Sequence, residues 1–150
     1  ESRELMSQSY FWYKRKESPL TWDGKTFGHL NGSVGAIIGY AIVGDLQQMN
    51  IDVEEVVSQW SNLRKLALGR IEGVVGLESM NDIVIETHPE KLRSIVKVYP
   101  PIMSKPYYLM LSHNFVSHNP ELAEAIWDGI RNIRQTGNYK EIASEYLSAH

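Results

Sequence analysis

The sequence predicts an α/β fold with a largely parallel sheet. Short runs of β-branched and aromatic residues alternate along the chain with segments whose apolar residues recur every three or four positions. This alternation is typical of βαβ units, whose strands pair in parallel. The composition agrees, because 150 residues that are 43% hydrophobic and 22% charged are enough to bury a substantial core.

Six strands are expected, and three of them end at glycine, proline or a charged run. Their ranges are 10–13, 33–38, a part of 51–57, 73–77, 94–99 and 107–111. The second and fourth are continuous apolar runs, which is typical of strands buried on both faces. Pro100 and Pro101 are expected to stop the fifth strand, since proline has no N–H to donate to a sheet.

Four helices are expected between and after these strands. Ile42, Leu46 and Met49 recur at i, i+4 and i+7 and predict a helix from about residue 41. Ser58 is expected to cap a helix that faces inward through Leu63, Leu66 and Ala67 and ends at Gly69. The last two are a helix capped by Asn119, with Pro120 at its first position, Leu122, Ile126, Ile130 and Ile133 on its apolar face and Gly137 at its end, and a helix over residues 139–147.

Composition and motifs exclude several classes of function. A net charge of −3 provides no basic surface for nucleic acid, and no apolar run approaches the roughly 20 residues of a membrane span. The chain has no cysteine, and its five histidines lack the i, i+4 spacing of metal ligands. Gly32-Ser33-Val34-Gly35 is not a nucleophile elbow, because Asn31 stands where that motif needs glycine. We therefore expect no enzyme, metal or cofactor.

One local pattern suggests binding. The strand over residues 33–38 leads through Gly39 and Tyr40 into a helix that begins near Ala41. The first N–H groups of such a helix are free, its dipole favours an anion, and ligands of α/β folds usually lie at the carboxyl ends of strands. Strand-turn-helix units are also common as purely structural elements. The aromatic run Tyr10–Tyr13 likewise suits either a pocket or a core-facing strand, and the core is the stronger interpretation.

Four stretches resemble the bacterial extracellular solute-binding proteins of family 3. They occur in the family's order and at roughly its spacing. The first is Met6–Phe11 with Arg15–Pro19, which is similar to the family's Phe-Ser-x-Pro-Tyr-Tyr and Arg-Lys-Asp-Ser-Pro segments. The second is Leu30–Gly35 with Gly39-Tyr40, and the third is Leu63–Val75, which is similar to the family's Leu-x-x-Gly-Arg-Ile-Asp-Ala-Val-Val. The fourth is Asn119–Leu122 with Gly137-Asn138-Tyr139 and Ile142.

The resemblance implies a periplasmic-binding-protein-like fold of two α/β lobes. Residues 20–101 would form a complete lobe 2. Residues 1–19 and 102–150 would form hinge strands and the C-terminal part of lobe 1, whose first part would be absent. An apolar face left uncovered in this way would favour association with the missing segment or with a second copy of the chain.

The resemblance also indicates four ligand-binding residues, Tyr10, Tyr40, Ala41 and Glu78. Ala41 stands where the family places a small hydroxyl residue at the start of a lobe 2 helix. Leu77 stands where the family places the aspartate that meets an amino acid's ammonium group, and Glu78 follows it. A buried ammonium needs a carboxylate partner, so a standard amino acid would require Glu78 to substitute.

The function implied is that of a non-enzymatic, periplasmic substrate-binding component of an ABC-type importer. It would capture a small polar solute, amino-acid-like or a small carboxylate, and deliver it to a membrane permease. A chain that opens at Glu1 without methionine is what a mature or truncated exported protein would show. The alternatives are a ligand-sensing domain of a membrane receptor or signalling protein, and a dehydratase-like enzyme with Glu78 as its acidic group.

Overall fold

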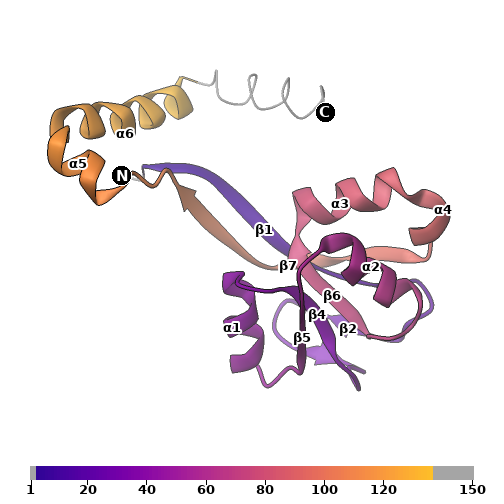
Figure 1. The fold of residues 1–150 in the computed structure, drawn as a ribbon. Helices are drawn as coiled ribbons and strands as arrows, with labels where there is room; N and C mark the ends of the chain where they lie inside the picture. Colours follow the sequence, from indigo (N-terminus) through magenta and orange to yellow (C-terminus); the bar gives the residue numbers. More distant parts are fainter. Residues whose placement is uncertain (1–2, 137–150) are drawn as a thin grey trace. The chain divides into compact units, whose positions relative to one another are not determined.

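A computed structural model describes residues 3–136, and its contacts divide the chain into two compact units. The larger unit is Gln8–Ser104, and the smaller unit combines Glu1–Ser7 with Lys105–His150. Strands β1 (Glu4–Arg15) and β7 (Ile95–Tyr108) run from one unit into the other (Figure 1). Both units therefore contain a part of each of these two strands.

The larger unit is built on a five-stranded mixed sheet in the order β5-β4-β6-β1-β7. Strand β4 (Val34–Ile37) pairs in parallel with both β5 (Val53–Val56) and β6 (Gly73–Leu77). Strand β1 runs antiparallel to β6. The predicted α/β class is confirmed, and parallel pairing links β5, β4 and β6.

Two hydrophobic clusters form on opposite faces of this sheet, because successive side chains of a strand point in opposite directions. Tyr10 and Trp12 of β1 join the cluster that contains helix α1 (Ala41–Gln48). Phe11 and Tyr13 join the cluster that contains helices α2 (Gln59–Ala67), α3 (Glu78–Thr87) and α4 (Pro89–Leu92). All four aromatic side chains are at most 5% exposed, so the core interpretation of this run is confirmed.

The position of the aromatic run explains where the larger unit begins. Residues 8–19 were expected to belong to the hinge and partial lobe 1, with lobe 2 starting at residue 20. The contacts group Gln8–Ser104 as one compact unit. The reason is that β1 inserts its aromatic side chains into both cores and pairs Tyr10–Tyr13 with Leu77–Val74 of β6.

Helix α2 follows its predicted signals. The Ser58 side chain accepts a hydrogen bond from the Ser61 backbone N–H at 3.2 Å, which satisfies one of the free donors at the helix start. Leu63 and Leu66 are fully buried. Gly69 adopts φ +70° just after the helix, a conformation that favours glycine.

The strands predicted over 94–99 and 107–111 are wrong as separate elements, because one strand, β7, covers residues 95–108. Pro100 and Pro101 lie inside it, and the Tyr99–Pro100 peptide is cis. Strand β7 is the last strand of the sheet. Proline is tolerated there because an edge strand can leave N–H positions unpaired without breaking a ladder.

Five elements were not predicted: the hairpin of β2 (Thr21–Trp22) and β3 (Phe27–Gly28), and helices α3, α4 and α5 (His113–His118). Helix α3 has a weak apolar period because its one buried position is Asn81, which is 1% exposed. The hairpin strands have two residues each, which is too short for an alternating pattern to show.

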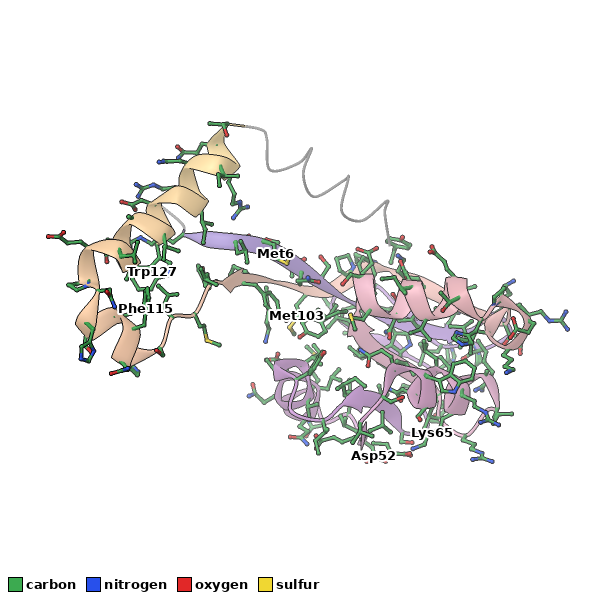
Figure 2. All side chains as sticks on the ribbon, turned by 45° about the horizontal axis from the view of Figure 1, so that its top comes forward. Met6, Asp52, Lys65, Met103, Phe115 and Trp127 are labelled. Atoms are coloured by element: carbon green, nitrogen blue, oxygen red, sulfur yellow. The ribbon has the colours of Figure 1, made fainter. Side chains whose placement is uncertain are left out.

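In the smaller unit, α6 (Pro120–Gln135) starts where it was predicted. The side chain of Asn119 does not cap the helix, and its amide instead donates to the Phe115 carbonyl of α5 at 3.3 Å. Trp127, labelled in Figure 2, donates its indole N–H to the Leu109 carbonyl at 3.0 Å. Leu122, expected on the apolar face, is 52% exposed.

Two expected features of this end cannot be compared with the structure. The predicted helix end at Gly137 and the predicted helix over 139–147 lie outside the described residues.

Within residues 3–136, Arg3 forms ion pairs with Glu124 and Asp128 of α6, and its guanidinium lies 5.3 Å from the centre of the Trp127 ring. The hydrogen bond to Glu124 raises the pKa of Arg3.

Gly35 and Gly44 make a matched test of the packing between β4 and α2. A Cβ on Gly35 would lie 1.8 Å from Asn62 Oδ1, whereas a Cβ on Gly44 of α1 would meet nothing within 4 Å. We expect Gly35→Ala to destabilise the protein by about 1–3 kcal/mol through overpacking. Gly44→Ala should stabilise it by up to about 1 kcal/mol, the helix propensity difference. Urea unfolding measures both, and an unchanged midpoint for Gly35→Ala would contradict the packing described.

Candidate functional site: the carboxyl edge of the larger unit

Three helices begin at one edge of the larger unit's sheet. Strands β5, β4 and β6 are parallel neighbours, so their carboxyl ends lie together, and they lead directly into α2, α1 and α3 (Figure 1). We call this the carboxyl edge and define it by residues 38–41, 57–59 and 77–79. Backbone N–H groups at helix starts lack intrahelical partners and carry partial positive charge. The edge therefore combines free donors with the positive ends of three dipoles.

The predicted site residues gather at this edge. Gly39, with φ +79°, makes the turn from β4, Tyr40 is the N-cap of α1, and Ala41 is its first residue. Glu78 is the first residue of α3. Tyr10 is paired with Leu77, the last residue of β6. The backbone thus places all four predicted positions near the carboxyl ends of two adjacent strands.

Their side chains differ in how far they can meet a solute. Ala41 is exposed, and Tyr40 is half-buried against the core cluster that contains α1. Tyr10 is only 1% exposed and is a member of that core cluster, so its ring is mainly a packing group. Leu77 is 8% exposed and packs in the same cluster. Accessible chemistry at these positions is concentrated at the start of α1 and at Glu78.

Glu78 is engaged by a lysine that sequence reasoning did not identify. Lys97 of β7 donates to the Glu78 carboxylate at 2.6 Å and also forms an ion pair with Asp82, one helical turn further along α3. The Tyr13 hydroxyl donates to the other oxygen of Asp82 at 2.7 Å. The signal in the sequence was the i, i+4 spacing of Glu78 and Asp82, which has meaning only once α3 is recognised as a helix.

Two aromatic rings complete the surroundings of the Lys97 ammonium. Its Nζ lies 5.1 Å from the centre of the Phe11 ring and 5.7 Å from that of Tyr99, within the range of cation–π attraction. The Lys97 side chain is 17% exposed. Burial lowers the pKa of Lys97, but hydrogen bonds and charges from Asp82 and Glu78 outweigh it and raise the pKa above its ordinary value. The ammonium therefore stays charged.

Tyr13 is held as a neutral donor by the same cluster. Burial raises the pKa of the Tyr13 hydroxyl first of all, and the hydrogen bond and negative charge of Asp82 raise it further. The Tyr13 side chain is inaccessible. We refer to Tyr13, Glu78, Asp82 and Lys97 as the Lys97 cluster.

Other groups on the carboxyl edge are polar or apolar but uncharged. Ser79 donates its hydroxyl to the Gln8 side-chain oxygen at 3.1 Å. Ile38 and Val57 expose 56% and 85% of their surface. The first turns of α1 and α2 contain no acidic residue, and that of α3 contains only Glu78. Such an edge offers hydrogen bonds and apolar contact to a small solute.

A separate hollow of about 380 Å³ lies at the other end of α1, bordered by residues such as Lys25, Phe27, Met49 and Ile51. Part of its lining follows the C-terminal end of the helix, where the dipole does not favour anions. The hollow shares no residue with the carboxyl edge. We place the candidate site at the carboxyl edge and not at this hollow, because the free backbone N–H donors and the charged side chain of Glu78 lie at the edge.

Comparison with solved structures identifies the fold. A histidine kinase sensor domain with similarity to periplasmic binding proteins superposes with a TM-score of 0.76 at 18% identity and covers 96% of this chain. ArgBP from T. maritima, in a mutant form, gives 0.72 at 18% over 97%. The GluR0 ligand-binding core, in complex with L-glutamate, gives 0.75 at 14% over 97%.

The chain therefore has the α/β fold of the periplasmic binding proteins, as the resemblance implied. It spans about 60% of the length of these solved chains. They are a sensor domain, a binding protein and a ligand-binding core, and none is described as a catalytic domain. No family model and no curated protein matches the chain.

Two further observations concern only the part of the chain that the structure describes. Within residues 3–136, no helix has both the length and the apolar character that a bilayer crossing demands. The same residues contain no group of three or more histidine or acidic side chains arranged to hold a metal ion.

Tyr13 provides a test of the Lys97 cluster through pH. A tyrosine whose pKa is raised by folding binds its proton more tightly in the folded state, so stability is complete below the ordinary pKa of about 10 and falls as the pH rises above it. We expect the urea midpoint to decrease as the pH is raised from about 9 to about 11, on either side of the ordinary tyrosine pKa of about 10. The decrease should be smaller in Tyr13→Phe. Equal slopes for the two proteins would show that Tyr13 is not held as described.

Proposed function

We propose that this chain is part of the substrate-binding component of an ABC-type importer, located in the periplasm, and that it holds a small polar solute at the carboxyl edge for delivery to a membrane permease. The solute class is amino-acid-like or a small carboxylate. The observation that carries the proposal is the gathering of three helix starts at one edge of a periplasmic-binding-protein-like fold, two of which, those of α1 and α3, have no side-chain cap.

The chemistry of the edge supports a ligand with a carboxylate. Free backbone donors at a helix start bind carboxylate oxygens, and the helix dipole adds favourable electrostatics. Tyr40 has no side-chain capping hydrogen bond to satisfy those donors in α1. The exposed Ile38 and Val57 could pack against an apolar part of the solute. Amino-acid ABC substrate-binding proteins are also among the structures with this fold.

A ligand-sensing domain of a membrane receptor is the second candidate. It is favoured by one specific finding, the similarity to a histidine kinase sensor domain over 96% of this chain. Both candidates bind a solute at the same edge, so they differ in what the complete protein contains. A membrane span and signalling domain after the binding region would support the sensor, and a protein with neither would support the importer.

A thermal-shift screen of the complete protein against amino acids, small carboxylates and polyamines tests whether a solute is bound. A solute present at 100 times its Kd stabilises the folded state by about 2.7 kcal/mol, which is a readily measured shift. We expect at least one amino acid or small carboxylate to give this shift, and polyamines to give none. A complete protein that responds to no member of the screen contradicts the proposed function.

Ala41→Glu tests the location of the site. A carboxylate at the first position of α1 would occupy the helix start and repel an anionic solute, while its interaction with the dipole favours the helix itself. We expect the affinity for the solute found in the screen to fall at least about tenfold, with no loss of thermal stability. Isothermal titration calorimetry measures the affinity.

The matched control is Gln47→Glu, which adds the same charge to an exposed position in the last turn of the same helix. This variant should bind like the parent protein. If both variants weaken binding equally, the effect is one of overall charge, and the solute is not held at the start of α1.

A further inference from the structure

The Lys97 cluster bears on which solutes the carboxyl edge accepts. Glu78 is the one acidic residue among the first turns of α1, α2 and α3. A solute with a charged ammonium group would have to find a carboxylate when it is buried, because an unpaired buried ammonium is strongly unfavourable. Whether Glu78 is available therefore decides whether this edge can receive such a group.

The structure shows that Glu78 is already paired with a lysine. Its carboxylate accepts from Lys97 at 2.6 Å, and Lys97 is held in place by three further contacts: the Asp82 carboxylate and the rings of Phe11 and Tyr99. Asp82 is itself fixed by the Tyr13 hydroxyl at 2.7 Å. Lys97 occupies one oxygen of Glu78 and is held there by several partners, so a solute ammonium that approached Glu78 would be repelled by a fixed cation beside it.

We propose that Lys97 is a specificity-determining residue, which withholds the Glu78 carboxylate from solutes and so restricts the carboxyl edge to carboxylates that bring no ammonium group to it. This rests on the proposed function and narrows its solute class from amino-acid-like or small carboxylate to the latter. Leu77, apolar and 8% exposed, strengthens the restriction, because the residue that precedes Glu78 also offers no charge.

Pairs of solutes that differ only in the α-ammonium group test the assignment. We would titrate the complete protein with L-glutamate and glutarate, L-leucine and 4-methylpentanoate, and L-phenylalanine and 3-phenylpropionate. For the pair that binds best, the acid without the ammonium group should bind at least about tenfold more tightly. Isothermal titration calorimetry gives the ratio of the two dissociation constants for each protein variant.

Four variants then locate the cause. Lys97→Met frees Glu78 and should shift the ratio toward the amino acid by about tenfold or more, and Lys97→Met combined with Glu78→Gln should restore the original ratio. Lys97→Arg keeps the charge and should leave the ratio unchanged. Lys91→Met removes an exposed lysine of α4 that lies over the Trp60 ring instead, and should also leave it unchanged.

Glu78→Gln keeps the test decisive if Lys97→Met does not fold, because it retains the ion pair of Lys97 with Asp82. Under the assignment, Glu78→Gln leaves the ratio of the two dissociation constants of a pair as it is in the parent protein. A parent protein that prefers the amino acid, or a Glu78→Gln variant that loses amino-acid binding about tenfold, would overturn the role of Lys97 while the proposed function stands. Failure of every solute to bind would remove the proposed function itself.

Discussion

The placement of strand β6 between β4 and β1 is the constraint on which the larger unit depends. Its five residues, Gly73–Leu77, are all buried, and it pairs in parallel on one side and antiparallel on the other. The parallel side aligns the carboxyl ends of β6, β4 and β5, which gathers the starts of three helices. The antiparallel side brings β1 and its aromatic residues against both cores. The edge and the Lys97 cluster both depend on this one strand.

Close packing around β6 and β4 gives the glycines of these strands a clear role. Gly35 and Gly76 leave room for the buried side chains of Asn62 and Asn81, and Gly73 leaves room for the ring of Trp12. A Cβ at any of these positions would approach its neighbour to less than 3 Å. The helices therefore lie close to the sheet, and the start of α3 is held at a fixed place relative to β7 and Lys97.

Much of this fold could be predicted from the sequence because its signals are local. The buried strands over 33–38 and 73–77, the Ser58 cap of α2 and the start of α6 at Pro120 each depend on a few neighbouring residues. Helix α3 could not be predicted in this way, since a polar residue, Asn81, occupies its buried position. The continuity of β7 through Pro100 and Pro101 depends on its place at the end of the sheet, which is a property of the whole topology.

The residues of the candidate site also differ in how far local sequence signals could identify them. Tyr40 and Ala41 could be assigned to this edge from the strand-turn-helix pattern, and Glu78 from the family resemblance, and the structure brings all three there. The partner of Glu78 could not, because Lys97 lies on another strand, 19 positions away along the chain. Only the pairing of distant segments shows that the acid at this edge already has a cationic partner, and the charge available to a solute depends on that pairing.

The most direct test of the site's placement is a map of backbone amide NMR shifts during titration of the complete protein with a solute that binds. We predict that the largest changes fall in residues 40–43, 58–61 and 78–80, the first turns of the three helices. Changes concentrated instead around Lys25, Met49 and Ile51, at the opposite end of α1, would contradict the placement of the site at the carboxyl edge.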